Sequence, residues 1–373
     1  MDCTPVVVAA RRTAIATSGR AFAALTASDL AAPVLHSVAA EVLDAGDRID
    51  DVVLGVARSL GGNPARVAVL SAGLDPQIPG MTVDRQCGSG LAAICVAADM
   101  VRSGSATIVL AGGTESASTA PAGRARFAPD EIGDPDMGPA AEELARVRGI
   151  ARERQDTYAR RSHLRAMAAD MSAEIIPVAG LQRDLRPRAI TAEVLARMPA
   201  AFVADGTVTA GNSCGISDGS AVVAIVPQWW STERGLPGLA IRGSAVVGVD
   251  PRLPGLGPVP AIEQALDNCG LTLADIDILE ITEAFAAQVL AVTDALGLDA
   301  LDADGMRICP QGGAIAMGHP WGASGAILMV RLFSQLVRQA VRSESSSKQP
   351  GRGIAACAVG GGMGVATVVE RVG

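Results

Sequence analysis

The chain has 373 residues, and its composition excludes several classes of protein. Aromatic residues make up only 2% of it, and 39 acidic residues outnumber 31 basic ones, which gives a formal net charge of −8. Nucleic-acid binders usually present a basic face and, for single strands, stacking aromatic side chains, so we expect no nucleic-acid partner. The length suits two domains or two fused similar units, and 49% hydrophobic residues with 42 glycines are typical of a globular α/β protein.

The N-terminus and the cysteines indicate where the protein works. Residues 1–10 lack the cationic stretch and apolar run of a signal peptide, and no apolar stretch is long enough for a membrane span. We therefore expect a cytoplasmic protein with no membrane partner. The seven cysteines form no CxxC pair, so we expect neither a disulfide framework nor a metal site. They are Cys3, Cys87, Cys95, Cys214, Cys269, Cys309 and Cys357.

The first half predicts alternating strands and helices. Four β-favouring runs are separated by helix-length segments. These runs are Val6–Ala9, Val52–Val56, Thr82–Arg85 and Thr107–Ala111. Apolar residues at helical spacing predict one helix from Ser28 to Leu43 and a second helix after Cys87. This order is typical of a layered unit of strands and helices.

After Pro237 the same order returns. The expected elements are a strand over Leu239–Val249, a helix over Pro260–Asn268, a strand over Ile276–Ile281 and a helix over Ala284–Leu296. Gly88–Ile94 resembles Ala323–Ile327, and each segment opens a helix that leads to an apolar strand ending in glycines. Those strands end at Ile108–Gly113 and Ala355–Gly361. Two matches in the same order predict a duplicated unit.

Residues 114–205 differ in composition and predict an inserted cap. Most of the dense charge lies there, and two expected helices, Pro139–Val147 and Arg152–Met171, have apolar positions on one side only. We therefore expect residues 1–113 and 206–228 to form an N-terminal half, 114–205 the cap, and 229–373 a C-terminal half. The polar run Ser343–Gln349 predicts a surface loop.

Cys87 is the candidate nucleophile. It lies in Arg85-Gln86-Cys87-Gly88-Ser89-Gly90, after a strand and at the start of a helix. A helix N-terminus offers unpaired N–H groups and a positive dipole end, which lower the pKa of a thiol and hold a developing oxyanion. Flanking glycines let a substrate approach the backbone. On this motif alone, an inert buried cysteine is favoured by roughly two to one.

A nucleophilic cysteine needs a base, and the chain has three histidines. His36 lies in a helical pattern of Ala and Val, and His163 lies in the charged cap, so both fit structural or surface roles. His319 lies on a glycine and proline turn, Gly318-His319-Pro320, before the helix of the second half. The internal repeat gives it nearly the mirror position of Cys87, so we expect the two side chains to meet at one seam.

The ordered motifs resemble those of the thiolase family. The four main blocks are Cys87–Gly90, Thr282-Glu-Ala-Phe285, Gly318–Gly325 and Gly360–Gly364, and further similar blocks are Asn63–Arg66, Gly112–Ser116, Gly206–Asn212 and Ser217–Gly219. The likeness spans nearly the whole chain, and several ordered blocks are more specific than any one of them. The resemblance implies a five-layered αβαβα thiolase fold of two duplicated halves with an inserted loop domain, assembled as a homodimer or homotetramer.

The resemblance also implies roles for single residues. Cys87 would take the acyl group of an acyl-CoA, His319 would activate it, and the N–H groups of Cys87 and Gly360 would form an oxyanion hole with His319. Coenzyme A enters as a substrate, and no permanently bound cofactor is expected. Substrate contacts are expected from Met137, Gly243, Phe285 and Trp321. Trp321 replaces a smaller aliphatic residue, Met137 follows an Asp where many short-chain thiolases have His, and Gly243 replaces a Ser that contacts CoA.

Two catalytic positions depart from the family pattern. Thr282 stands where the family has an Asn that orders a water, and its hydroxyl has a shorter reach. The family's second cysteine, which moves the α-proton, stands two residues before the glycine run, where this chain has Ala358. Cys357 is one residue earlier, and neighbouring side chains on a strand point to opposite faces. We therefore expect Cys357 to point away from the site unless a β-bulge shifts it.

Three functions fit these residues. The first is an acetyl-CoA C-acyltransferase, which condenses two acyl-CoA molecules or cleaves a 3-ketoacyl-CoA with CoA. The second keeps the acyl-Cys87 intermediate but transfers the acyl group to another nucleophile or to an activated carbon acid, because loss of a general base commonly costs about 10² to 10⁴ in rate. The third is a thiolase-fold scaffold without activity. Cys87 and His319 favour an enzyme, and the first function is preferred.

Overall fold

The structure is a computed structural model that describes residues 2–342 and 351–373. The surface loop expected at Ser343–Gln349 lies outside the described residues. Among the described helices, none is long and apolar enough to cross a membrane.

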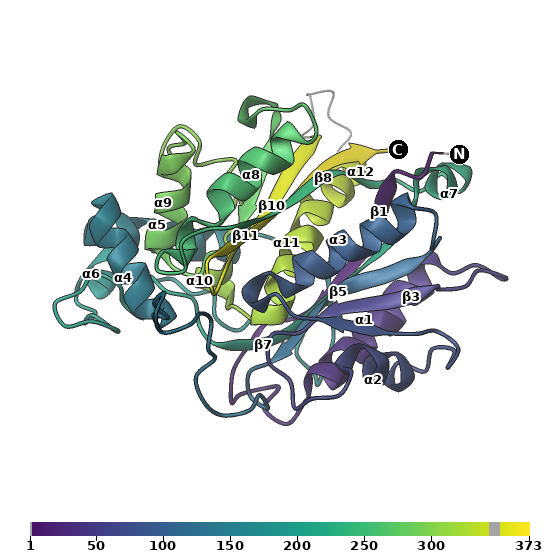
Figure 1. The fold of residues 1–373 in the computed structure, drawn as a ribbon, viewed down its shortest axis with the longest axis horizontal. Helices are drawn as coiled ribbons and strands as arrows, with labels where there is room; N and C mark the ends of the chain where they lie inside the picture. The colour runs from purple at the N-terminus through teal and green to yellow at the C-terminus, as the bar shows by residue number, and fades with distance from the viewer. Residues whose placement is uncertain (1, 343–350) are drawn as a thin grey trace.

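One mixed sheet runs through both halves of the chain (Figure 1). The strand order along it is β4-β3-β5-β7-β1-β8-β11-β10-β9. The strands are β1 (Pro5–Thr13), β3 (Asp51–Gly55), β4 (Met81–Val83), β5 (Val109–Ser116), β7 (Ser217–Pro227), β8 (Gly238–Gly248), β9 (Ile278–Ile281), β10 (Arg352–Val359) and β11 (Met363–Val372). Two short strands pair at its side, β2 (Ala16–Thr17) with β7 and β6 (Ile175–Ile176) with β1.

The two ends of the sheet have the same pairing pattern. In the first half β3 is parallel to β4 and β5, β5 is antiparallel to β7, and β7 is antiparallel to β1. In the second half β9 is parallel to β10 and to an isolated bridge at Ile308, β10 is antiparallel to β11, and β11 is antiparallel to β8. β1 and β8 join the halves as antiparallel neighbours. The repeated pattern agrees with the predicted duplication.

The helices complete five layers. α1 (Ala27–Val42) and α2 (Pro64–Ser71) form a buried cluster with one face of the first-half strands, and α8 (Pro258–Asp267) and α9 (Ala286–Ala295) do the same in the second half. α3 (Ser89–Arg102) and α11 (Trp321–Phe333) share the central core between the two halves (Figure 1). These layers agree with the αβαβα order that the resemblance implies. Other helices outside the cap are α7 (Gln228–Glu233), α10 (Ala314–Met317), α12 (Gln339–Arg342) and a π-helical turn, Ser334–Arg338.

The two central helices touch through glycines at their N-terminal ends. A Cβ atom on Gly90 would lie 2.7 Å from the carbonyl oxygen of Gly322, and one on Gly325 would lie 2.6 Å from the backbone nitrogen of Leu91. No larger side chain fits at these positions without moving a helix. This contact brings together two turns. The turn before α3 carries Cys87, and the turn before α11 carries His319.

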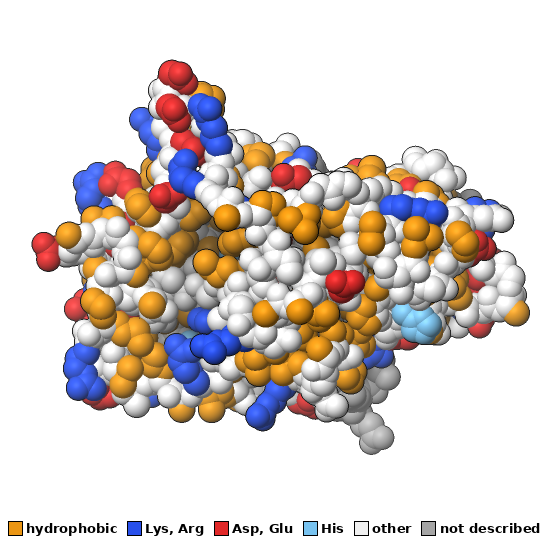
Figure 2. All heavy atoms as spheres, turned by 90° about the horizontal axis from the view of Figure 1, so that it is seen from below, with side chains coloured by type: hydrophobic (Ala, Val, Ile, Leu, Met, Phe, Trp, Pro, Cys, Tyr) orange, Lys and Arg blue, Asp and Glu red, His pale blue; other side chains and the backbone are white. Residues whose placement is uncertain are grey.

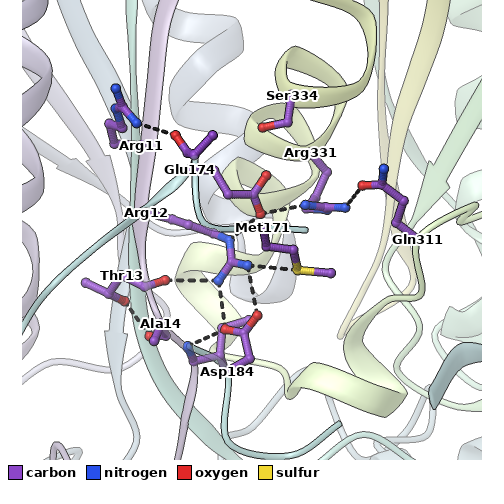
Figure 3. A network of polar contacts seen from close by, with 12 residues as sticks. Arg11, Arg12, Thr13, Ala14, Met171, Glu174, Asp184, Gln311, Arg331 and Ser334 are labelled. Carbon is purple, nitrogen blue, oxygen red and sulfur yellow. Dashed lines mark hydrogen bonds and ion pairs between the residues drawn. The ribbon is translucent and has the colours of Figure 1, made fainter. Parts of the chain in front are cut away.

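The cap contains α4 (Met137–Arg148), α5 (Arg152–Ala168) and α6 (Ala192–Ala196). A buried ionic network ties its connecting segment to both halves (Figure 3). Arg12 of β1 pairs with Glu174 and Asp184 of the cap at 2.8 Å each, and Arg331 of α11 pairs with Glu174 at 2.6 Å. Although burial opposes it, the two guanidinium groups lower the pKa of Glu174 to about 2. The network therefore holds the cap while Glu174 stays ionised.

The expected strands and helices are present, with ends that differ. The strand expected over Thr107–Ala111 runs on to Ser116, and the helix expected to reach Met171 ends at Ala168. Residues 112–116 of β5 all pair with β7. Pairing with this neighbouring strand therefore extends β5 past Gly112 and Gly113, where β-propensity alone would end it.

Candidate active site

Cys87 lies on a tight turn between β4 and α3. The 3₁₀ turn Gln86–Gly88 follows Arg85, and Gln86 has a φ of +44°. This left-handed conformation costs a residue with a side chain on the order of 1–3 kcal/mol. Asp84 accepts a hydrogen bond from the Gln86 N–H at 2.7 Å, and the hydroxyl of Ser89 accepts one from the Arg85 N–H at 2.8 Å. The neighbouring side chains therefore hold Cys87 in a strained, fixed turn.

A cavity of about 970 Å³ opens beside this turn. Cys87, His319 and Gly360 all line it, so the three residues of the expected oxyanion hole border one space. One face of the molecule is hollowed, with hydrophobic side chains around the hollow and basic side chains grouped beside it (Figure 2). The volume is at the upper end of the usual range for small-molecule sites.

The environment of Cys87 keeps its sulfur protonated. Burial, and to a smaller extent the nearby carboxyl group of Glu115, raise the pKa of the Cys87 thiol to about 12. Hydrogen bonds to the sulfur from the N–H groups of Gly360 and of Cys87 itself act in the opposite direction but are weaker. The lowering expected from the helix N-terminus is thus outweighed by burial. A base must remove the proton when a substrate arrives.

His319 has the tautomer that such a base requires. Its Nδ1 lies 2.6 Å from the hydroxyl of Ser324, and that hydroxyl donates its one proton to the carbonyl oxygen of Pro320 at 2.9 Å. Both bonds form at once when Nδ1–H donates to the hydroxyl, and that tautomer leaves the Nε2 lone pair free. Burial lowers the pKa of His319 to about 4, so the ring is neutral at pH 7. A neutral imidazole with a free Nε2 can accept the thiol proton.

Backbone contacts fix the His319 turn against both halves. The His319 N–H donates to the carbonyl oxygen of Gly215 at 3.0 Å. Gly318 has a φ of +118°, and a Cβ there would lie 2.2 Å from the Ser217 hydroxyl, so only glycine fits. The buried carboxylate of Glu115 accepts the N–H of Gly322 at 2.7 Å and two N–H groups from residues 57 and 58 at 3.1 Å each.

Thr282 and Cys357 contact each other instead of the cavity. The Thr282 hydroxyl donates to the Cys357 sulfur at 3.3 Å, both side chains are buried, and neither lines the cavity. β10 keeps a regular register with β9 and β11 from Gly353 onward, without a bulge. Strand alternation therefore turns Cys357 into the core and presents Ala358 to the cavity.

The expected substrate contacts divide in the same way. Met137, Phe285 and Trp321 line the cavity, and Phe285 packs edge-on against Phe202 with ring centroids 5.9 Å apart. Gly243 does not line it. It lies on β8 facing α8, where a Cβ would lie 2.5 Å from the sulfur of Cys269. The structure thus places Gly243 in the packing of a sheet against an outer helix.

The other two histidines lie elsewhere. His36 is exposed on α1, with its Nδ1 3.2 Å from the carbonyl oxygen of Ala72. His163 is buried in α5, and burial lowers its pKa to about 4. Neither ring lines the cavity.

Several cavity residues were not predicted from the sequence, and Cys214, Arg58 and Arg186 are three of them. Cys214 lines the cavity and lies between two of the loops that border it. Its N–H donates to the carbonyl oxygen of Ala284 at 2.9 Å, and the carbonyl oxygen of the next residue, Gly215, accepts the N–H of His319. Arg58 and Arg186 also line the cavity. Cys214 lies two residues after the Gly206–Asn212 block, and that proximity is the local signal that could have marked it.

Comparisons with known proteins agree with this geometry. Residues 5–228 match the thiolase N-terminal domain, and residues 237–371 match the thiolase C-terminal domain. This chain belongs to the thiolase family. The thiolase is 40% identical over 374 residues to the putative acetyl-CoA C-acetyltransferase YhfS of Bacillus subtilis, with 98% of each chain covered.

Two further relatives are similar over their full length. The thiolase is 39% identical over 404 residues to the acetyl-CoA acetyltransferase of Escherichia coli K12, covering 98% of this chain and 99% of the relative. The crystal structure of the Bacillus anthracis acetyl-CoA acetyltransferase superposes with a TM-score of 0.89 at 36% identity, over 99% of both chains. Fold and family therefore follow from the whole thiolase chain rather than from single motifs.

Proposed function

We propose that this thiolase is an acetyl-CoA C-acyltransferase that carries its acyl group on Cys87. The observation that carries the proposal is that His319, whose Nδ1 lies 2.6 Å from the Ser324 hydroxyl, lines the same cavity as Cys87. The relatives that cover the full chain are named acetyl-CoA acetyltransferases, which supports acyl-CoA as the substrate class.

The residues of the cavity account for the first half-reaction. The Cys87 sulfur attacks the thioester carbonyl while its proton moves to Nε2 of His319, and the carbonyl oxygen becomes an oxyanion. The N–H groups of Cys87 and Gly360 are the expected donors to that oxyanion. When the tetrahedral intermediate collapses, the C–S bond to CoA breaks, and His319 returns the proton to the CoA thiolate. The products are acyl-Cys87 and free CoA.

The second half-reaction depends on how the α-proton of the acceptor moves. Ala358 offers no thiol to the cavity, and Cys357 is buried on the other face of β10. This observation favours a second candidate function, in which acyl-Cys87 reacts with another nucleophile or with a carbon acid that is more acidic or loses CO₂. Loss of a positioned base is expected to slow the Claisen step by about 10² to 10⁴.

Two assays test the proposal. Intact-mass analysis after mixing with acetyl-CoA should reveal an acetyl adduct that is absent in Cys87→Ala and retained in Cys357→Ala, since Cys357 does not line the cavity. Cleavage of acetoacetyl-CoA by CoA should then be measured for the wild type and for Ala358→Cys. Turnover by the wild type supports the acetyltransferase, an adduct without turnover supports the altered acceptor, and no adduct with any acyl-CoA favours the scaffold.

We also propose that the enzyme works in the cytoplasm, where acyl-CoA is available, as a homodimer or homotetramer. Size-exclusion chromatography with light scattering would test the assembly, and a monomer at micromolar concentration would contradict it.

A further inference from the structure

The cavity holds more positive than negative charge, although the whole chain is acidic. Three arginines line it, Arg58, Arg124 and Arg186, whereas Asp136 is the one carboxylate among the described lining residues. Arg124 is paired with Asp136 and with Asp134. Neither Arg58 nor Arg186 has a carboxylate partner within the described parts of the chain. Two cations therefore face the cavity uncompensated.

Arg186 lies beside the catalytic turn. A Cβ added to Gly215 would lie 2.3 Å from its Cζ, so the guanidinium covers the backbone of Gly215. The carbonyl oxygen of Gly215 accepts the N–H of His319, and Cys214 is its chain neighbour. Nε of Arg186 is buried and has no hydrogen-bond partner among the described residues. Burial and the nearby charge of Arg188 lower the pKa of Arg186, as expected for a cation that lacks a counterion.

Arg58 is anchored near the same turn by different contacts. Its backbone N–H donates to Glu115, its guanidinium donates to the carbonyl oxygen of Pro121, and its Cζ lies 6.0 Å from the ring centroid of Trp321. Arg58 thus has a protein acceptor and an aromatic face for its side chain. Of the two cations, Arg186 is the one whose buried Nε lacks an acceptor.

Arg186 is half-buried, and a guanidinium whose buried Nε lacks an acceptor is costly unless an anion supplies one. The phosphates of CoA are one source of anion, but the whole pantetheine arm separates them from the thioester sulfur. Arg186 lies against the residue that holds His319, and therefore near the acyl end of a bound acyl-CoA. A carboxylate at the far end of the acyl chain would meet a guanidinium there and accept paired N–H bonds.

We propose that the preferred acyl donor is a CoA thioester of a dicarboxylic acid, with its free carboxylate bound by Arg186. The inference rests on the proposed acyl transfer to Cys87 and narrows its substrate class. Phe285 and Met137 also line the cavity, and such apolar side chains would contact the methylene carbons between the two carboxyl carbons of this acyl group.

Paired acyl donors of equal chain length test the proposal. Succinyl-CoA and butyryl-CoA differ mainly in the terminal carboxylate, and the rate of Cys87 acylation is followed by release of CoA and by intact mass. We expect succinyl-CoA to be preferred, and Arg186→Gln to lower that preference by about 10- to 100-fold with little change for butyryl-CoA, the range for a charge-assisted hydrogen bond. Arg188→Gln is the matched control, since Arg188 is exposed and does not line the cavity.

The alternatives give different results. Should Arg186 bind a CoA phosphate, Arg186→Gln would slow both donors equally and would leave N-acetylcysteamine thioesters, which lack phosphates, unaffected. That result, or a wild-type preference for butyryl-CoA, would overturn the inference. Acylation by butyryl-CoA alone would still leave the proposed acyl transfer intact, whereas acylation by neither donor would count against both.

Discussion

Replacing Ser324 with alanine tests the tautomer of His319. The Ser324 hydroxyl accepts from Nδ1–H at 2.6 Å, and Ser324→Ala would leave that buried donor unsatisfied and let the ring adopt the other tautomer. An unsatisfied buried polar group costs about 1–3 kcal/mol, which corresponds to roughly 10- to 100-fold in the rate of Cys87 acylation. Ser324 does not reach the reacting atoms in this account, and its effect passes through His319.

The assay is stopped-flow release of CoA from acetyl-CoA, with unfolding by urea measured alongside. Ser231→Ala is the matched control, because the Ser231 hydroxyl also bonds a carbonyl of its own helix, at 3.0 Å, but contacts no histidine. We expect similar small stability losses in both variants and slow acylation only in Ser324→Ala. Ser324→Thr, which restores a hydroxyl, should recover much of the rate. A folded Ser324→Ala enzyme that acylates at the wild-type rate would refute the tautomer assignment.

Three further outcomes follow from the structure. Ala358→Cys should raise any acetoacetyl-CoA cleavage, whereas Cys357→Ala should leave it unchanged; collapse of turnover in Cys357→Ala would mean that β10 shifts register in solution. In the folded protein the pKa of His319 is lowered to about 4, so its neutral ring contributes stability at neutral pH. As pH falls from about 6.5 to 4, this contribution, on the order of 3 kcal/mol, is lost. Urea midpoints measured across that pH window should therefore fall less in His319→Gln than in the wild type. Glu174 has its pKa lowered to about 2, so the stability it adds above about pH 4.5 is lost as pH falls toward 2. Glu174→Gln should cost about 3–5 kcal/mol at pH 7, because Arg331 loses its carboxylate partner and Arg12 keeps only Asp184, and an unchanged urea midpoint would contradict this.

Much of the fold could be predicted because its signals are local. The duplication was predicted from short apolar runs, from strands that end in glycines and from the similarity of Gly88–Ile94 to Ala323–Ile327. The same pairing pattern at the two ends of the sheet agrees with this prediction. The period of two along a strand predicts that Cys357 points away from the cavity, and β10 has no bulge that would change this direction. Local rules of this kind hold where the backbone is regular.

Other parts of the site depend on contacts between distant segments. The pKa of Cys87 was expected to be lowered by a helix N-terminus, but burial and Glu115, which comes from another strand, raise it. Arg186 reaches the cavity only because the cap folds over Gly215, and no local pattern marks an arginine as unpaired. Gly243 was placed by alignment with the family, yet it packs against Cys269. Tertiary neighbours decide the charge and exposure of such residues.

Peptide mapping of the enzyme quenched during reaction with acetyl-CoA tests the central claim most directly. We expect a single acetyl group, sensitive to hydroxylamine, on the peptide that contains Cys87, and slow formation of this group in His319→Gln. An acetyl group on Cys214 instead, or undiminished labelling of Cys87 without the imidazole of His319, would contradict it.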